Sequence, residues 1–432
     1  MVDPEAEARQ KIDEMLVESG WIIQDYEERT LGAGIGVAVR EYPTSAGPAD
    51  YALFVDGVIA GVVEAKKFGT TLTGIVDQSE RYLDGLYEKF SDLKQKPPFS
   101  YETTGIKTKF ADRRDPDYRS RHVFTFHRPE QLKKWLEDDV TLRGRLRTIP
   151  KLDYPGLREC QSDAINGLEK SFAKNNPRAL IHMTMGAGKT FAAVTSVYRL
   201  LKFAKAKRIL FLVDRNNLGI QAKKEFQTYK IPHDGRAFTD MYNIQPLQSH
   251  TIDPTCEVVI STIQRMYSIL KGEKEFDNEK EQFSSFEDPD EDEEPKYVDY
   301  NENVPIGEFD FIIIDECHRS IYTKWRQVIE YFDAFLIGLT ATPSDRTLGF
   351  FRRNEVSRYT HEQAVVDKVN VTYQSYQLKT KHTEQGLTIE AGALVERRDR
   401  LTHQGEIEYL KEDQTFGGKI LIMMWSQKTQ FD

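Results

Sequence analysis

Residues 183–190, with the sequence MTMGAGKT, carry the clearest chemical signal in the chain. They follow an apolar run at 179–181 and precede a helix-compatible segment at 191–194, an order typical of loops that bind nucleotide phosphates. The glycines let successive backbone N–H groups turn toward phosphate oxygens, while a lysine neutralises the phosphates and a threonine hydroxyl binds Mg²⁺. We therefore expect ATP at Gly186, Ala187, Gly188, Lys189 and Thr190, although Met183 replaces the usual first glycine.

A second chemical group lies at residues 310–318, with the sequence DFIIIDECH. An apolar run of this kind predicts a strand that is buried on both faces of a parallel sheet. Ligands of open α/β sheets bind beyond the carboxyl ends of the strands, which is where Asp315 and Glu316 would lie. We expect Asp315 to hold Mg²⁺ and Glu316 to orient or deprotonate an attacking water.

A third group lies at residues 50–66, which read as two β-rich arms around an Asp-Gly turn. Strand side chains alternate, so Glu64 and Lys66 project from one face. A two-residue turn alone offsets Asp50 from Glu64 by one position, whereas a three-residue turn or one bulge pairs them. Once paired, Asp50 and Glu64 would bind Mg²⁺ with the carbonyl of Ala65, and Lys66 would stabilise charge on a phosphate.

The order of the motifs resembles the DEAD/DEAH-type motor core of superfamily 2 helicases and DNA translocases. The resemblance rests on the phosphate loop, the DECH run, the LTATP segment at 339–343 and two segments that follow predicted strands. It implies that Gln161 reads the adenine base. It also implies that a DNA backbone is contacted, and coupled to the nucleotide state, by Arg215, Thr262, Gln264, Thr340 and Thr342.

The segment before the motor resembles the PD-(D/E)XK nuclease fold. Gln78 and Tyr82 follow Lys66 and lie four residues apart, on one face of a helix. A Gln-x-x-x-Tyr element in this place is similar to the nuclease domain of the restriction (R) subunit of type I restriction-modification enzymes, and residues 5–9 match that family's first helix. The resemblance implies that Gln78, Tyr82 and Glu7 support the nuclease residues.

These placements predict an α/β fold with three parts. We expect a PD-(D/E)XK-type mixed-sheet endonuclease domain at 1–148, a RecA-like parallel-sheet motor domain at 152–347, and the start of a second RecA-like domain at 348–432. Strands are expected at 121–126, 369–373 and 419–425, and a helix at 129–136. No arginine-finger element follows residue 346, so we expect the N-terminal part of a longer subunit.

The charge of the chain is concentrated in one segment. The net charge is −10, and residues 271–302 alone hold 14 acidic and 4 basic residues, so the remaining 400 residues are balanced. We expect 271–302 to be a solvated loop on the motor surface that points away from the DNA. A tolerated insertion is a simpler interpretation of it than a regulatory element.

Composition indicates a cytoplasmic protein. A chain of 432 residues with 39% hydrophobic content can build two or three cores. Its apolar runs fall well short of the eighteen or so residues of a membrane span, and the acidic N-terminus has no secretory signal. Cys160, Cys256 and Cys317 fit no disulfide or metal spacing and suit a reducing compartment.

Three interpretations of function follow. The first is an ATP-dependent translocase and Mg²⁺-dependent endonuclease acting on double-stranded DNA, which by resemblance would assemble with methyltransferase and specificity subunits. The second is a superfamily 2 ATPase whose N-terminal module binds DNA without cutting it. The third is a nucleotide-dependent adaptor. The combination of Asp50, Glu64 and Lys66 favours the first over the second, and Lys189 with Glu316 argues against the third.

Overall fold

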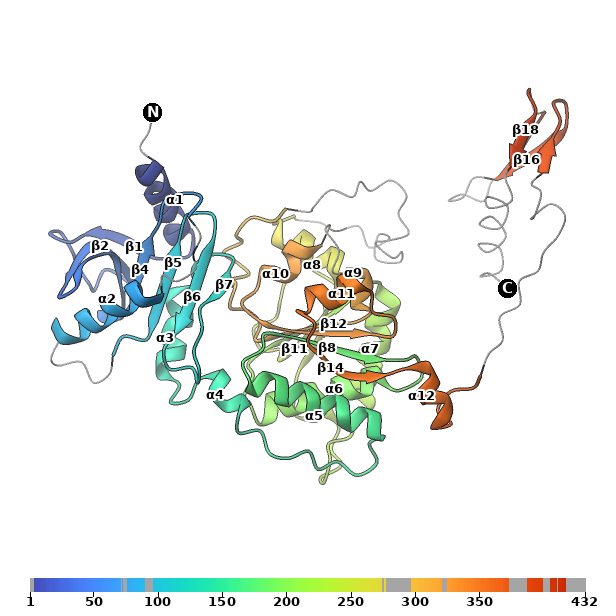
Figure 1. The fold of residues 1–432 in the computed structure, drawn as a ribbon, viewed down its shortest axis with the longest axis horizontal. Coiled ribbons are helices and arrows are strands. Elements are labelled where there is room, and N and C mark those ends of the chain that lie inside the picture. Colours follow the sequence, from blue (N-terminus) through green and yellow to red (C-terminus); the bar gives the residue numbers. More distant parts are fainter. Residues whose placement is uncertain are drawn as a thin grey trace. The chain divides into compact units, whose positions relative to one another are not determined.

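The computed structural model describes residues 4–70, 72, 76–89, 96–273, 276, 297–320, 325–372, 387–398, 405–409 and 411–416. The chain forms two compact units, Met1–Asn370 and Val371–Asp432 (Figure 1). The first unit holds two seven-stranded sheets. In the part of the chain that is described, no helix combines the length and the apolar character needed to cross a bilayer.

The first sheet is mixed and keeps its strands in chain order, β1 to β7. Parallel pairs join β1 to β2 and β4 to β5, and the other neighbours are antiparallel. Its elements are α1 (Pro4–Glu18), β1 (Ile22–Asp25), β2 (Gly36–Thr44), β3 (Gly47–Val55), β4 (Val58–Ala65), α2 (Val76–Lys89), β5 (Phe99–Thr103), β6 (Thr108–Asp112), β7 (Arg121–Val123), α3 (Pro129–Glu137) and α4 (Leu142–Leu146).

Strand alternation divides the apolar residues of this sheet between two clusters. One face packs against α1 and α3, through residues such as Leu16 and Leu132. The opposite face packs against α2, through Leu83 and Leu86. The helix expected at 129–136 is confirmed as α3, whereas the strand expected at 121–126 is only the three residues of β7.

The β3–β4 hairpin settles the register that the sequence left open. Its turn has two residues, Asp56 and Gly57, both with positive φ, which suits a tight hairpin turn. A bulge at Ala60 then shifts the pairing, so that Tyr51 lies opposite Val63. The next pair in that register joins Asp50 to Glu64, as the bulged alternative predicts.

The second sheet is parallel and has the strand order β10-β11-β9-β12-β13-β8-β14. Its order is that of an open α/β sheet, in which crossover helices cover both faces. Its elements are α5 (Glu159–Ala173), β8 (Arg178–Met183), α6 (Lys189–Lys202), β9 (Ile209–Val213), α7 (Asn216–Thr228), η1 (Phe238–Asp240), β10 (Ile244–Pro246), β11 (Val258–Thr262), α8 (Ile263–Leu270), β12 (Phe311–Ile314), α9 (Cys317–Ser320), α10 (Arg326–Glu330), β13 (Phe335–Thr340), α11 (Asp345–Phe350), β14 (Glu355–Tyr359) and α12 (His361–Val366).

Helices cover both faces of this sheet (Figure 1). Figure 1 shows α5 and α6 on one face and α8, α9, α10 and α11 on the other. In β12, Ile313 faces the α5–α6 side while Ile312 and Ile314 face the α8–α10 side, as the alternation of a strand requires. The prediction of a strand buried on both faces is therefore confirmed for β12.

The two sheets share one hydrophobic core. A single cluster of buried side chains includes Phe110 and Val123 of the first sheet together with Val304 and Tyr331 of the motor segment. The ring of Phe124 lies 4.8 Å from that of Tyr331. Our sequence interpretation treated the two parts as separate domains, but the structure packs them as one compact unit.

The end of the motor sheet differs from the boundary expected at residue 347. Strand β14 pairs with β8, so the sheet continues to residue 359, and the unit ends at Asn370. Residues 369–372 form no strand. Instead, the backbone N–H groups of Val369 and Asn370 donate to the carbonyl of Ala364 and cap α12.

The second unit contains two small antiparallel sheets among its described residues. In one, β15 (Leu387–Ile389) pairs with β18 (Gln414–Phe416), and in the other β16 (Leu394–Arg398) pairs with β17 (Gly405–Tyr409). The strand expected at 419–425 and most of the acidic loop expected at 271–302 lie outside the described residues. The assignment of 348–432 to a second RecA-like domain stays a prediction.

Candidate nucleotide and nuclease sites

The predicted phosphate loop joins β8 to α6 at the carboxyl edge of the second sheet. Gly186 and Gly188 adopt φ values of 78° and 82°, in the left-handed region that glycine favours. Gly188 is also the N-cap of α6, so Lys189 and Thr190 begin the helix. The N-terminus of a helix presents free N–H groups and a positive dipole end to an anion. The loop, the lysine and the threonine thus have the arrangement that phosphate binding needs.

Three side chains hold the outward-facing carbonyls of this loop. Asn370 Nδ2 donates to Met185 O at 3.0 Å, and Arg158 Nη1 donates to Gly186 O at 2.9 Å. Gln161 Nε2 donates to the carbonyl of Ala187 at 3.2 Å. These contacts hold the shape of the loop from outside.

Gln161 has a different set of contacts from a residue that is free to read a base. Its side-chain oxygen accepts from the backbone N–H of Arg158 at 3.0 Å, and its nitrogen donates to the loop carbonyls of Ala187 and Gly188. It is buried. In this arrangement Gln161 positions the loop, and adenine reading by Gln161 stays a prediction.

The two motor carboxylates lie beside the loop lysine. Lys189 Nζ is 3.4 Å from Glu316 Oε1. Asp315 is buried, and its burial together with the charge of Glu316 raises its pKa to about 6. Glu316 has a φ of 45°, in the left-handed region that non-glycine residues seldom adopt. The structure thus brings Lys189, Asp315 and Glu316 together, as predicted.

A contact joins this carboxylate pair to the end of β13. His318 Nδ1 lies 3.4 Å from Glu316 Oε2 and 3.0 Å from the hydroxyl of Thr340. Thr340 is fully buried and accepts a hydrogen bond from the backbone N–H of Thr342, which is itself exposed. A chain of contacts thus runs from Glu316 through His318 to Thr340.

The residues predicted to contact DNA follow β9 and β11, which are neighbours in the sheet. Thr262 lines a groove of about 480 Å³ and caps α8 by accepting from the backbone N–H of Arg265. Arg215 contacts Asp214 at 3.7 Å, and the side-chain oxygen of Gln264 is buried without a hydrogen-bond partner. The groove is also lined by basic and polar side chains, among them Asn216, Lys223 and Arg265.

The two carboxylates predicted for the nuclease, Asp50 and Glu64, lie on the neighbouring central strands β3 and β4 of the first sheet. Asp50 Oδ2 accepts from the backbone N–H of Ala65 at 2.8 Å, and its Oδ1 accepts from Arg9 Nη2 at 2.9 Å. Lys66 Nζ contacts Glu64 Oε1 at 2.6 Å. Burial raises the pKa values of both Asp50 and Glu64. The negative charges of neighbouring carboxylates raise them as well.

These donors fit a divalent cation in one respect. The second carboxylate oxygen of Glu64 is buried and has no hydrogen-bond partner, although only 4% of the residue is exposed. A buried anionic oxygen without a partner is costly unless a cation binds it. Within the described ranges, however, no three His, Cys, Asp or Glu residues group to hold a metal, so the fit rests on Asp50, Glu64 and the Ala65 carbonyl.

The residues predicted to support the nuclease are less closely gathered. Tyr82 packs from α2 on the cluster that lies on the carboxylate-bearing face of the sheet. The side chain of Gln78 lies outside the described residues. Glu7 is exposed on α1, and the α1 residue that reaches Asp50 is Arg9.

Sequence patterns missed two residues that the structure brings to the sites. Arg9 contacts Asp50 from 41 residues away, and Asn370 contacts the phosphate loop from 185 residues away. Arg9 lies within residues 5–9, which resemble the first helix of the family. That resemblance was the signal in the sequence that could have pointed to Arg9. Nothing in the sequence around Asn370 marks it.

Two family models match the chain, one over each sheet. Residues 155–345 match the model described as "Type III restriction enzyme, res subunit". Residues 28–109 match "Type I restriction enzyme EcoKI endonuclease subunit second domain". The first match covers most of the second sheet with the phosphate loop and the DECH run, and the second covers the strands that carry Asp50 and Glu64.

Curated relatives make the relationship more specific. The EcoKI endonuclease subunit of Escherichia coli K12 is 28% identical over 95% of this chain and 39% of its own length. The EcoAI endonuclease subunit of Escherichia coli is 33% identical over 44% of this chain and 19% of its own. The chain is thus related in sequence to the endonuclease subunits of type I restriction enzymes, which confirms the resemblance drawn from the motifs, and spans about two fifths of the length of the first relative.

Two of the solved structures that align with this chain do so with low TM-scores. A fragment described as an HsdR subunit of a type I restriction enzyme from Vibrio vulnificus YJ016 aligns with a TM-score of 0.32 and 22% identity, over 84% of this chain and 60% of the other. The SWI2/SNF2 ATPase core from Sulfolobus solfataricus, solved with double-stranded DNA, aligns with a TM-score of 0.31 and 16% identity, over 45% and 34%.

Proposed function

We propose that this chain is the nuclease and first motor portion of a type I restriction endonuclease subunit, which hydrolyses ATP to move along double-stranded DNA and cuts it. The observation that carries the proposal is the presence of two complete polar sites in one packed unit. Lys189 lies against Glu316 at the edge of the second sheet, and Asp50 lies beside the Glu64–Lys66 pair in the first.

For ATP hydrolysis, the loop N–H groups and Lys189 bind the phosphates, and Glu316 orients the attacking water or accepts its proton. Thr190 and Asp315 would hold Mg²⁺, which neutralises phosphate charge when bound. Thr340, through His318, reports the state of this site to the segments that grip DNA. Those segments contact backbone phosphates, so binding should depend on salt and be indifferent to sequence.

For DNA cleavage, Asp50 and Glu64 would hold Mg²⁺, whose chemistry is to activate a water as nucleophile. Arg9 and Lys66 now contact these carboxylates. Lys66 would turn from Glu64 to the scissile phosphate when a cation takes over the carboxylate. Methyltransferase and specificity subunits would supply site recognition, and the assembly would act in the cytoplasm.

The test is an assay of the enzyme assembled with methyltransferase and specificity subunits, given Mg²⁺, ATP and a circular DNA with an unmodified site. The parent should hydrolyse ATP and cut the circle. Lys189→Ala should do neither, whereas Asp50→Ala should hydrolyse ATP and leave the DNA intact. A parent that hydrolyses ATP without cutting would contradict the proposal.

One observation favours a second candidate, an ATPase with a non-cleaving DNA-binding module. Arg9 and Lys66 already pair with the two carboxylates, which is also how a purely structural acidic pair would be neutralised. Mg²⁺ distinguishes the two candidates: it should raise the melting temperature of the parent but not of Asp50→Ala if the carboxylates bind metal.

A further inference from the structure

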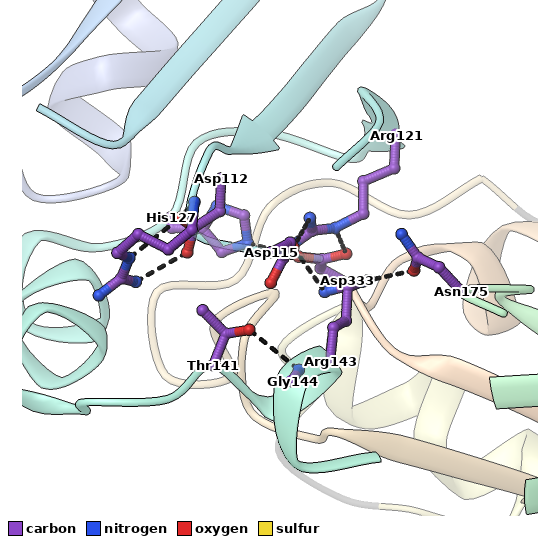
Figure 2. A network of polar contacts seen from close by, with 10 residues as sticks. Asp112, Asp115, Arg121, His127, Thr141, Arg143, Gly144, Asn175 and Asp333 are labelled. Atoms are coloured by element: carbon purple, nitrogen blue, oxygen red, sulfur yellow. Dashed lines mark hydrogen bonds and ion pairs between the residues drawn. The ribbon is translucent and has the colours of Figure 1, made fainter. Parts of the chain in front are cut away.

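A buried polar network crosses between the two sheets (Figure 2). Asp333 belongs to the motor segment and stands two residues before β13. Arg121 and His127 belong to the first sheet and the segment that follows it. The side chains of Asp333 and His127 expose only 6% and 0% of their surface.

Asp333 accepts from both partners at once. Arg121 donates from Nε to Oδ1 and from Nη2 to Oδ2, each at 2.7 Å. His127 Nε2 lies 2.9 Å from Oδ2 of the same carboxylate. A bidentate pair between guanidinium and carboxylate fixes direction as well as distance, because both groups are planar.

The tautomer of His127 follows from its neighbours. Nε2 faces a carboxylate, which only accepts, so this nitrogen carries the proton. Nδ1 then accepts from the hydroxyl of Tyr101 at 2.8 Å, and the hydroxyl oxygen accepts from the backbone N–H of His127 at 3.3 Å. A neutral imidazole satisfies every group, and burial lowers the pKa of His127 accordingly.

The network connects the strands that carry the two sites. Tyr101 lies on β5, directly before Glu102, which is in register with Glu64. Asp333 precedes β13, whose far end is Thr340 at the nucleotide site. A strand of six residues spans roughly 20 Å. Asp333 thus stands at one end of a motor strand and Thr340 at the other.

Resting on the proposed function, we propose that Asp333 is a positioning residue that fixes the nuclease sheet on the first motor sheet as one body. It acts through Arg121 and His127 and touches no reacting atom. Its removal leaves Arg121 buried without its main partner, which breaks the directional contact while the shared hydrophobic core persists. The nuclease site would then no longer keep a fixed position relative to strand β13 of the motor sheet.

The experiment compares Asp333→Asn with the parent and with Glu330→Gln in the assembled enzyme. Glu330 is a matched control because it accepts from Arg178 at 2.7 Å and Arg326 at 2.9 Å, both within the motor. The measured quantity is DNA cuts per ATP hydrolysed. A merely structural defect reduces the amount of active enzyme and lowers both rates together, so only a positioning role lowers their ratio.

We expect Asp333→Asn to lower the ratio at least fivefold and Glu330→Gln to leave it unchanged. Tyr101→Phe removes only the hydroxyl that holds His127, and it should also lower the ratio of DNA cuts to ATP hydrolysed. This variant provides the test if Asp333→Asn does not fold. A parental ratio in whichever of the two variants folds overturns the proposal.

A second measurement separates this proposal from the proposed function. Limited proteolysis between the sheets, within residues 138–158, needs neither cleavage activity nor ATP. Asp333→Asn should be cut there several times faster than the parent and Glu330→Gln at the parental rate. Equal rates of proteolysis in Asp333→Asn and the parent overturn the positioning role of Asp333, even if the parent cuts DNA. A parent that never cuts DNA overturns only the proposed function.

Discussion

The hydroxyl of Thr340 lies 3.0 Å from Nδ1 of His318, so the end of β13 touches the segment that carries both motor carboxylates. If this contact transmits the state of the nucleotide, Thr340→Val should leave ATP binding within about twofold of the parent. ATP hydrolysis by the assembled enzyme should fall roughly tenfold, the value of one hydrogen bond to a charge-paired group. Thr347→Val, at a buried threonine that caps α11, is the control. ATP hydrolysis by Thr340→Val at the parental rate would show that this contact does not transmit the state of the nucleotide.

Lys189→Ala should abolish ATP binding in titration calorimetry. The loop would lose the lysine expected to neutralise the phosphates, and N–H groups alone do not offset the phosphate charge. Lys202→Ala, at the other end of α6, should bind ATP as the parent does. Undiminished binding by Lys189→Ala would place the nucleotide elsewhere.

Gly188→Ala should weaken ATP binding at least tenfold. A Cβ at this position would lie 2.3 Å from Gln161 Nε2, so either the loop or the side chain that holds it must move. Gly156→Ala is a sharp control, because Gly156 also has a positive φ, of 94°, but a Cβ there meets nothing within 4 Å. If both variants bind ATP equally, the packing of Gln161 on the loop is unimportant.

Glu64→Gln should reduce DNA cleavage roughly a hundredfold or more while raising the melting temperature measured without metal. Burial and the charges of Asp50 and Glu102 raise the pKa of Glu64, so its ionised form costs folding free energy at neutral pH. Glu14→Gln, on the exposed side of α1, should change neither quantity. A fall in melting temperature would mean that the Lys66 contact outweighs this cost.

The contribution of His127 to the free energy of unfolding should decrease as the pH falls through about 6.5, the ordinary pKa of histidine. Burial, with Arg121 and Arg143 nearby, lowers the pKa of His127 although Asp333 opposes the shift. The unfolded chain therefore takes up a proton that the folded chain refuses, which costs at most about 1.4 kcal/mol per pH unit. His127→Gln should flatten this slope in denaturant titrations between pH 7.5 and 5.5. His233→Gln, at an exposed site, should not.

The motor site could be predicted because its parts are local. The phosphate loop and the DECH run are contiguous segments, and each follows a strand whose apolar residues identify it. The contacts of Asn370, Arg9 and Asp333 could not be predicted, since each joins residues far apart in sequence and depends on how whole sheets pack. The extension of the second sheet beyond residue 347 could not be predicted for the same reason: β14 pairs with the distant β8.

The bulge at Ala60 decides which face of the sheet receives Glu64. Ile59 and Val62 both pack on the α2 face although an unbulged strand would send them to opposite faces. If β4 paired regularly through Ala60, Glu64 would lie opposite Ala49 and turn toward α1 and α3, away from Asp50. Inserting one residue into β4 between the bulge and Glu64 would therefore keep every acidic and basic residue of the chain and still disassemble the site. Among related sequences, the spacing between turn and glutamate is accordingly a better guide to a working nuclease than the presence of the residues themselves.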